Sequence, residues 1–231
     1  MRLDKYLADA LNISRVDAKK LIKQKKVSVN EKILTNTNLI IDENKDYIKV
    51  ENELIKYQKY IYLMLHKPSG YLSATFDKQD KTVIDLIPNN FKYKDLSIVG
   101  RLDKDTEGLL LLSNDGSFVH QLTSPKKHIP KKYYVEYSGT LLEDSEDLVK
   151  KGLNIDNEYT TLPAILERIS LGSAYITIYE GKFHQVKKML DKLNTKVTYL
   201  KRVKIGNLEL DDLKLGEIRE LTENDLKKLK D

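Results

Sequence analysis

The sequence predicts an α+β protein in which a small segment of helices and strands precedes a larger domain made mostly of strands. Three observations indicate this class: helical apolar spacing in residues 1–32, a polar lysine-bearing stretch at 51–59, and strand-like apolar runs beyond it. The 231 residues suffice for a small and a larger domain, at roughly 100–200 residues per domain. We therefore expect one domain with its linker at residues 1–58 and a second domain at 59–231.

Two short helices are expected at the start of the chain. Leu3, Leu7 and Leu11 recur at near-helical spacing, and residues 14–17 resemble a capping box that opens a second helix through about Ile22. Basic residues repeat every four positions along this helix, which is typical either of a solvated face or of a surface that binds a polyanion. These residues are Arg15, Lys19 and Lys23.

The remaining elements follow from apolar periodicity. Residues 25–30 resemble a strand that enters a turn, and short apolar runs within 33–50 predict small strands that complete the first domain. In the larger domain, strands are expected at 60–65, 108–112, 133–137, 174–179 and 196–203. Helices are expected near 117–123, 144–151 and 183–193. This mixture is typical of an α+β domain.

Charge is distributed unevenly along the chain, although 40 Lys and Arg against 35 Asp and Glu leave a net charge of only +5. Residues 1–32 hold nine basic and four acidic side chains, and residues 181–204 hold eight basic side chains and one acidic residue, Asp191. Two separate positive segments indicate a polyanionic partner, RNA or DNA.

Several function classes are excluded or disfavoured by composition. The absence of cysteine excludes disulfides, thiolate zinc sites and cysteine nucleophiles, and the four histidines lack the close pairing that metal sites favour. We therefore predict no metal. The amino terminus has no apolar leader, and no run approaches 18 uncharged apolar residues, so we expect a cytoplasmic protein that does not enter the membrane.

The segment with the most chemical promise is 100–112, where a charged loop runs directly into four leucines. Arg101 and Asp103 are expected at the mouth of a buried strand, where a rigid scaffold can position them. Local pattern alone favours a turn or capping role for Asp103 over a catalytic one.

The first segment resembles the S4 RNA-binding domain, of the αL type. The resemblance lies in Met1-Arg2-Leu3-Asp4-Lys5-Tyr6-Leu7 and in Ser14-Arg15 before the basic helix. It implies RNA binding through that helix and the turn that follows it. The RNA-binding residues expected on this basis are Arg2, Arg15, Lys19, Lys23, Lys25 and Lys26.

The loop at 100–112 resembles the motif Gly-Arg-Leu-Asp-x-x-Thr-x-Gly-Leu-Leu around the catalytic aspartate of the RluA and RsuA families of pseudouridine synthases, at every specified position. Three more of the family's motifs occur in order. These are Leu65-His66-Lys67-Pro68-Ser69-Gly70, Lys131-Lys132-Tyr133, and Glu180-Gly181-Lys182-Phe183-His184-Gln185-Val186-Lys187-Lys188-Met189. The resemblance implies a catalytic domain built on a mixed, mainly antiparallel sheet with flanking helices, and a reaction without cofactor.

The resemblance also implies roles for individual residues. Asp103 is the catalytic carboxylate, Tyr133 stacks on the target uracil and can remove its C5 proton, and Lys187 is the cation that keeps the carboxylate ionised. Helical periodicity independently places Lys187 at the margin of an apolar stripe, with Lys188 turned away. The stripe consists of Phe183, Val186, Leu190 and Leu193.

The remaining candidate residues belong to the pocket and its surroundings. The resemblance implies that Arg101 fills the space left by an extruded base. The substrate pocket is expected to include Lys67, Leu102, Thr106, His184 and Gln185, and further phosphate contacts are expected from Lys126, Lys127, Lys201 and Arg202.

Taken together, the motifs predict a pseudouridine synthase of the RsuA type, acting on 16S ribosomal RNA or a small-subunit assembly intermediate, as a monomer. The segment Leu122-Thr123-Ser124-Pro125 resembles the small-subunit branch, the 16S rRNA pseudouridine(516) synthases. A large-subunit (23S) enzyme and a non-catalytic RNA-binding assembly factor are the alternatives. A glycosidase that pairs Asp103 with Glu107 is a third reading, weakened by the RNA-binding module.

Overall fold

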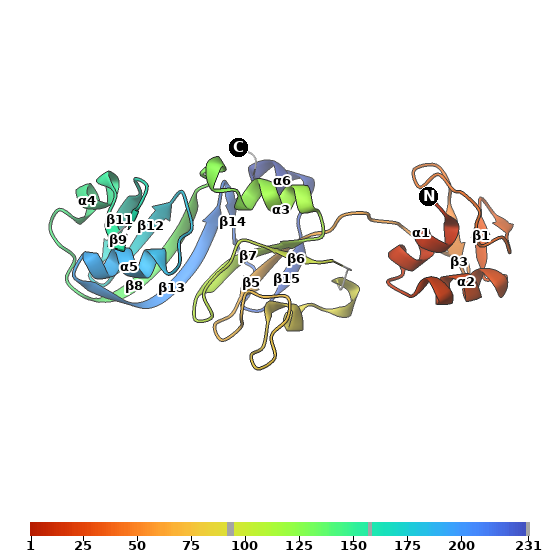
Figure 1. Cartoon of the computed structure of the whole chain (residues 1–231), viewed down its shortest axis with the longest axis horizontal. Coiled ribbons are helices and arrows are strands. Elements are labelled where there is room, and N and C mark those ends of the chain that lie inside the picture. Colours follow the sequence, from red (N-terminus) through yellow and green to blue (C-terminus); the bar gives the residue numbers. More distant parts are fainter. Residues whose placement is uncertain (92–94, 157–158, 230–231) are drawn as a thin grey trace. The chain divides into compact units, whose positions relative to one another are not determined.

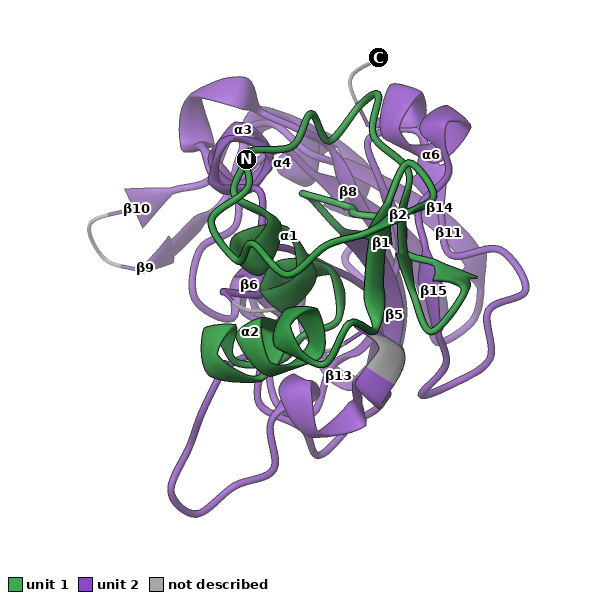
Figure 2. Cartoon of the chain, turned by 90° about the vertical axis from the view of Figure 1, so that its right-hand side faces the viewer, with its two compact units in different colours: residues 1–61, 92–94 green, residues 62–91, 95–231 purple. Residues whose placement is uncertain are grey.

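The computed structural model describes residues 1–91, 95–156 and 159–229, and it divides into two compact units (Figures 1 and 2). The first unit is Met1–Ile61, and the second begins at Tyr62. The domain boundary after residue 58 stays a prediction. No helix in the described part of the chain has both the length and the apolar character needed to span a membrane.

The first unit packs two helices, α1 (Leu3–Ala10) and α2 (Arg15–Lys23), beside a small sheet. The predicted cap of α2 is present, because the backbone N–H of Asp17 donates to Oγ of Ser14 over 3.1 Å. The sheet has the order β2-β1-β3-β4, with β1 Val27–Val29, β2 Lys32–Ile33, β3 Ile48–Val50 and β4 Glu53–Leu54. Strand β4 lies within the polar stretch at 51–59.

One large sheet is the frame of the second unit. Within the described residues it has nine strands, in the order β11-β12-β8-β13-β7-β5-β15, with β6 beside β7 and β14 beside β13. Every pairing is antiparallel except the one between β7 and β13, so the predicted mixed, mainly antiparallel sheet is confirmed. The strands are β5 Tyr62–Lys67, β6 Ser97–Val99, β7 Glu107–Ser113, β8 Lys131–Gly139, β11 Ile165–Ser170, β12 Ser173–Ile178, β13 Thr195–Ile205, β14 Leu208–Glu209 and β15 Ile218–Glu220.

The parallel contact between β7 and β13 explains the glycine of the 100–112 motif. Gly108 pairs with Arg202 and has φ of +111°. A Cβ at position 108 would overlap the backbone of Arg202, including its nitrogen at 2.6 Å. Glycine is therefore required both for the backbone conformation and for the close approach of the two strands.

Helices cover the sheet in two groups (Figure 1). Helix α4 (Ser145–Lys151) contacts β11 and α5 (Gln185–Lys192) contacts β13, whereas α3 (Gly116–Thr123) packs on β6 and β7. A last helix, α6, spans Glu223–Lys228, and β9 (Asn154–Asp156) and β10 (Tyr159–Thr160) form a separate small pair. The three predicted helices are confirmed.

The predicted apolar stripe near α5 needs one correction. Val186, Leu190 and Leu193 are buried, but Phe183 is 73% exposed. The helix begins only at Gln185, because His184 before it has a left-handed φ of +53°. Phe183 therefore lies outside the helical register, and its ring stacks on that of His184 with centroids 3.8 Å apart.

Candidate active site

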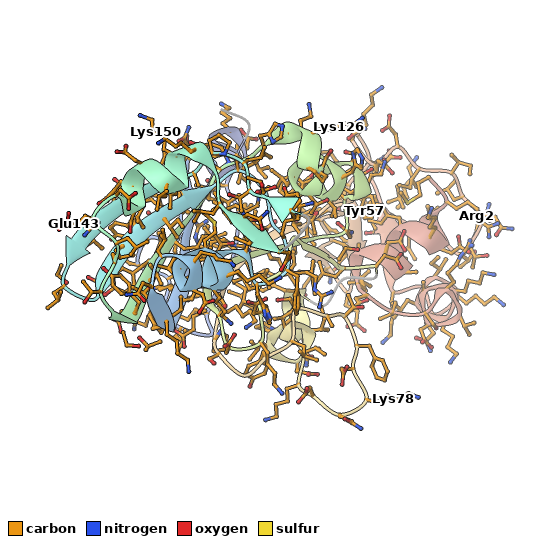
Figure 3. The ribbon with its side chains drawn as sticks, turned by 60° about the vertical axis from the view of Figure 1, so that its left-hand side comes forward. Arg2, Tyr57, Lys78, Lys126, Glu143 and Lys150 are labelled. Carbon is orange, nitrogen blue, oxygen red and sulfur yellow. The ribbon has the colours of Figure 1, made fainter. Side chains whose placement is uncertain are left out.

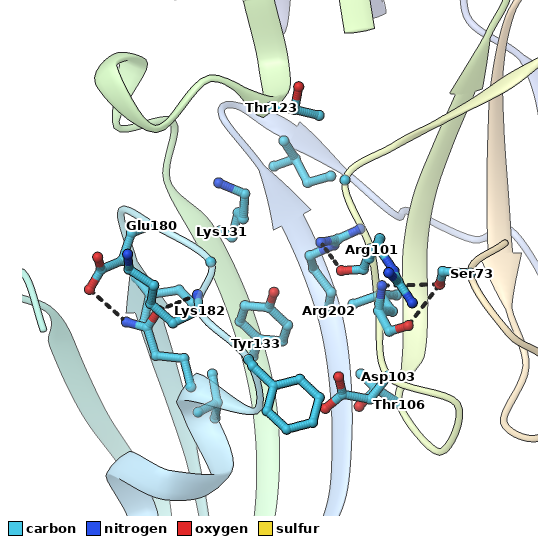
Figure 4. A pocket seen from close by; sticks show the side chains of 18 of the residues that line it. Ser73, Arg101, Asp103, Thr106, Thr123, Lys131, Tyr133, Glu180, Lys182 and Arg202 are labelled. Carbon is cyan, nitrogen blue, oxygen red and sulfur yellow. Dashed lines mark hydrogen bonds between the residues drawn. The ribbon is translucent and has the colours of Figure 1, made fainter. Parts of the chain in front are cut away.

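A cavity of about 830 Å³ opens in the second unit where β8, β13, α5 and the loop before β7 meet (Figure 4). Asp103 comes from the loop, Tyr133 from β8 and Lys187 from the first turn of α5, and all three line the cavity. The three residues predicted as catalytic are thus brought together, although 84 positions separate Asp103 from Lys187 in the sequence (187 minus 103).

Lys187 lies between two carboxylates. Its Nζ is 3.3 Å from Oδ2 of Asp103, and it donates to both carboxylate oxygens of Asp105, at 2.6 and 2.9 Å. The hydrogen bond from Lys187 holds the pKa of Asp105 below its usual value of 3.8. Nε2 of His184 lies 3.7 Å from Oδ2 of Asp103. Sequence reasoning missed Asp105, whose position two residues after Asp103 in the same motif was the available signal.

Lys67 holds the loop of Asp103 from below the cavity. Its side chain is fully buried, and the three N–H groups of its Nζ are shared among four carbonyl oxygens. These belong to Pro68, Asp103 and Lys104, each at 3.1 Å, and to Thr106 at 2.9 Å. Burial lowers the pKa of Lys67 to about 8. Lys67 is not among the residues that line the cavity, so its expected place in the substrate pocket is replaced by a place beneath the loop.

Ser73 gives the loop a second anchor. Its Oγ donates to the carbonyl oxygen of Leu102 over 2.7 Å and accepts from the N–H of the same residue over 3.1 Å. Leu102 and Thr106 are both buried and both line the cavity, as predicted. Because buried hydrogen bonds restrain the backbone on both sides of Asp103, its carboxylate is presented by a rigid loop.

The other side of the cavity is formed by β8 and the segment before α5. Tyr133 is 7% exposed, and Lys131, two residues earlier, also lines the cavity, as expected for one face of a strand. Gln185 is buried, and its Nε2 donates to Oε1 of Glu180 over 3.0 Å. Its Oε1 accepts from the N–H of Lys182 over 2.9 Å. Gln185 therefore orders the turn that leads to Lys187.

Arginines occupy both exposed and buried positions at this site. Arg101 is exposed at the cavity wall. Arg202 was predicted as one of several phosphate contacts; it is only 1% exposed and lines the cavity. Its Nε donates to the carbonyl oxygen of Leu109 over 2.8 Å.

Comparisons with known proteins agree with this geometry. Residues 61–192 match the family of RNA pseudouridylate synthases, and residues 1–46 match the S4 domain. The chain belongs to the RNA pseudouridylate synthase family. It is 41% identical to an uncharacterized RNA pseudouridine synthase of Bacillus subtilis, over 98% of this chain and 97% of the relative. It is 37% identical to the ribosomal small subunit pseudouridine synthase A of Escherichia coli, over 98% of both chains.

A solved structure carries the same conclusion. The crystal structure of a pseudouridylate synthase is similar to this chain with a TM-score of 0.70 and 35% identity, covering 99% of each chain. The expected assignment to an S4-bearing pseudouridine synthase is therefore confirmed. The protein is an enzyme that isomerises uridine in RNA.

In the S4 domain of this synthase, three of the predicted RNA-binding cations surround one buried carboxylate. Asp4 is 0% exposed, and it accepts hydrogen bonds from Arg2 at 2.9 and 3.0 Å and from Arg15 at 2.9 Å. Nζ of Lys19 lies 3.9 Å away. Burial opposes ionisation of Asp4, but the two arginines outweigh it and lower the pKa of its carboxyl below 3.8. Sequence reasoning did not find this role for Asp4.

The other predicted RNA contacts of the synthase are spread over its surface. Lys23 and Lys25 are exposed, and Lys26 is paired with Glu51 at 2.6 Å. Lys126 and Lys127 lie in an exposed 3-10 helix, η3 (Pro125–Lys127), where Figure 3 labels Lys126. Lys201 is half-buried on β13.

The pairing of Asp103 with Glu107 that a glycosidase would need is not favoured by the geometry. Glu107 does not line the cavity, and its Oε2 accepts a hydrogen bond of 2.7 Å from the hydroxyl of Tyr199. Two carboxylates that flank a scissile bond must both face the substrate. Glu107 instead links β7 to β13 through this hydrogen bond.

Proposed function

We propose that this synthase converts a uridine of ribosomal RNA to pseudouridine, and that its substrate is 16S RNA, either free or in a small-subunit assembly intermediate. Whole-chain similarity to the small-subunit enzyme of E. coli supports this substrate, as does the Leu122–Pro125 segment. The proposal includes action as a monomer. It also includes a cytoplasmic location.

The observation that carries the proposal is the convergence of Asp103, Tyr133 and Lys187 on one cavity. Pseudouridine formation breaks the bond from C1′ to N1, turns the uracil and joins its C5 to C1′. No electrons or groups are gained or lost overall, so no cofactor is needed. The residues must supply a negative charge near C1′, a surface that holds the freed base, and an acceptor for the C5 proton.

Asp103 is suited to the first task. Its carboxylate can attack C1′ or stabilise an oxocarbenium-like centre there, or it can assist loss of the 2′ proton in a glycal route. Lys187, 3.3 Å from Oδ2, favours the charged carboxylate. Because the loop is fixed, the carboxylate of Asp103 is already in place when positive charge develops at the sugar, and no free energy is needed to reorganise it.

Tyr133 is suited to the second and third tasks. Its ring lies in the cavity on a central strand, where it can stack on an extruded uracil, and its hydroxyl can accept the C5 proton. Arg101, exposed at the cavity wall, can enter the gap that the flipped nucleotide leaves in the RNA. Base release, rotation and reattachment can then occur within one enclosed site.

The test is to incubate the protein with unmodified ribosomal RNA of its host and to map pseudouridine by carbodiimide-blocked primer extension. We expect one new stop in 16S RNA, and none with Asp103→Asn. A stop only in 23S RNA would overturn the substrate, and the absence of any stop would overturn the proposed activity on ribosomal RNA.

A further inference from the structure

Two cations of the cavity, the buried Arg202 and the half-buried Lys131, have no negative partner among the described residues. Among the residues that the structure describes, neither Lys131 nor Arg202 forms an ion pair with a carboxylate. Arg202 donates through Nε to Leu109 and through Nη1 to the carbonyl oxygen of Arg101 over 3.5 Å, while its Nη2 is buried without a described partner. Nζ of Lys131 donates to the carbonyl oxygen of Ile129 over 2.9 Å.

The register of β8 and β13 directs both cations into the same cavity. Arg202 pairs with Tyr133, and Ile205 pairs with Lys131, because an irregularity between Arg202 and Lys204 inserts one extra residue in β13. Paired residues of neighbouring strands lie on the same face of the sheet, and Tyr133 is two positions from Lys131 on β8, so Arg202 and Lys131 both face the cavity. In Figure 4 the two cations lie above the ring of Tyr133, and Asp103 lies below.

This arrangement is costly unless an anion binds. A buried cation without a counter-charge loses its hydration, and two cations near each other also repel. The effect is visible in Lys131, since burial and the charge of Arg202 lower its pKa to about 8. An anion placed between the two cations would reverse both penalties and would satisfy Nη2 of Arg202.

We propose that Arg202 and Lys131 form a subsite for a backbone phosphate that flanks the extruded uridine. The inference rests on the proposed function, because uridine itself is uncharged and the phosphodiester is the anion that an RNA substrate brings. A planar guanidinium with a free N–H suits phosphate oxygens, and the lysine adds a second charge. A phosphate held beside Tyr133 would set the position of the ribose relative to Asp103.

The experiment uses short RNAs that contain the mapped target uridine. In two of them the phosphodiester on the 5′ or the 3′ side of that uridine is a neutral methylphosphonate. The sugar before each such linkage is 2′-deoxy to prevent strand scission, so in the 3′ case the target nucleotide is 2′-deoxyuridine, and each RNA has a control with the same sugar and a normal phosphate. Single-turnover kcat/KM is measured for the full-length wild type, Lys131→Met and Lys132→Met.

We expect Lys131→Met to lower kcat/KM roughly 10- to 100-fold on normal RNA, as for loss of a charge-assisted hydrogen bond. On the methylphosphonate RNA that lacks the contacted charge, kcat/KM should be almost the same for Lys131→Met and for the wild type. The position of that methylphosphonate, 5′ or 3′, identifies the phosphate that Lys131 contacts. Lys132→Met is the matched control, because Lys132 is outside the cavity lining and pairs with Glu167 at 2.7 Å. It should behave as the wild type.

If Lys131→Met lowered kcat/KM by the same factor on all the RNAs, the proposed subsite would be refuted, because the effect of the lysine would then not depend on the charge of either phosphate. Arg202→Lys gives a second test that keeps the charge but removes the free Nη2, and a thermal melt beside each assay shows whether the variant is folded. The kcat/KM of Arg202→Lys should fall on normal RNA and should differ little from that of the wild type on the same methylphosphonate RNA. Absence of reaction by the wild type on normal RNA would instead refute the proposed function.

Discussion

The two units of this synthase hold their cations in opposite ways. In the S4 domain, Arg2 and Arg15 keep about half of their side chains exposed, at 41% and 51%, while their shared partner Asp4 is buried. In the catalytic unit, Lys67 and Arg202 are themselves buried, and backbone carbonyl oxygens accept their hydrogen bonds. The Asp4 cluster of the S4 domain thus buries its anion and exposes its cations, whereas Lys67 and Arg202 of the catalytic unit are cations that are themselves buried.

The difference separates two uses of positive charge. Exposed cations attract a polyanion from solution and release its counterions, so their contribution is spread over many contacts and weakens with salt. Buried cations are shielded from salt and hold one loop or one ligand group in a defined place. Substitutions in the S4 domain should therefore change RNA affinity, and substitutions around the cavity should change the rate of reaction.

The sharpest test of this division is Asp103→Asn. The substitution keeps the size of the side chain but removes the charge near C1′, so we expect turnover to fall about 1,000-fold or more. RNA affinity should stay within about twofold of the wild type, since phosphate contacts are unchanged. Single-turnover kinetics and filter binding measure the two quantities.

Asp105→Asn is the matched control for that experiment. Asp105 accepts the shorter hydrogen bonds from Lys187, but its side chain is 69% exposed. We expect a loss of tenfold or less in turnover. If both variants lost activity equally, the special role of Asp103 would be refuted, and a parallel loss of RNA binding would make Asp103 a structural residue.

The second largest effect is expected for Lys67→Met, which removes the donor to four carbonyl oxygens and frees the loop of Asp103. Because a displacement of about 1 Å can cost about 100-fold in rate, we expect a loss of that order in kcat with little change in RNA affinity. Lys104→Met is the control, since that lysine lies on the same loop and pairs with Asp80 at the surface.

The pH dependence of the activity tests whether the ammonium of Lys67 supports catalysis. The pKa of Lys67 is lowered from 10.5 to about 8, so its ammonium loses a proton and a donor above pH 8, and wild-type activity should fall there. Between pH 8 and 10.5 the unfolded chain binds the proton that the folded one has lost, so this group's contribution to stability rises. Unfolding caused by this group therefore cannot explain the loss. In Lys67→Met the decline should be smaller, and an unchanged decline would exclude Lys67 as its cause.

Local features of the fold were predictable from the sequence. The cap at Ser14 and the spacing of leucines determine α1 and α2, because these interactions lie within a few residues of each other. The strand that contains Leu109–Leu112 was predictable because it is buried on both faces and therefore reads as a continuous apolar run. The family motif then identified Asp103.

Features that depend on distant segments were not predictable. Arg202 was predicted only as a phosphate contact, because nothing in its neighbourhood reveals that its side chain is buried and donates to the carbonyl oxygen of Leu109 on another strand. The four carbonyl oxygens around Lys67 belong mainly to a loop about 36 to 39 residues away, and carbonyl groups have no sequence signal. Asp4 was read as one residue of a motif, although its burial between two arginines organises the S4 surface.

A third prediction, of intermediate size, concerns Asp4→Asn. Without the carboxylate charge, Arg2 and Arg15 lose their common anchor, so we expect roughly tenfold weaker RNA binding with turnover at saturating RNA unchanged. Because the pKa of Asp4 is lowered below 3.8, its stabilising effect is present above that value and is lost as pH falls through the lower folded pKa. Hydrogen exchange of S4 amides should show this acid sensitivity in the wild type and not in the variant. Equal affinities would show that the arginines need no anchor.

The smallest effect is expected for Lys23→Ala, at the end of the basic stripe of α2. The side chain is exposed, so the substitution should leave folding intact and weaken RNA binding only a few-fold. Loss of one phosphate contact should reduce the slope of log K against log salt by about 0.7 to 0.9. Lys20→Ala, on the same helix but paired with Asp17 at 3.2 Å, serves as the control and should keep the wild-type slope. If the two variants had the same slope, the stripe of Arg15, Lys19 and Lys23 would be a solvated helix face, and RNA binding by this domain would have to use another surface.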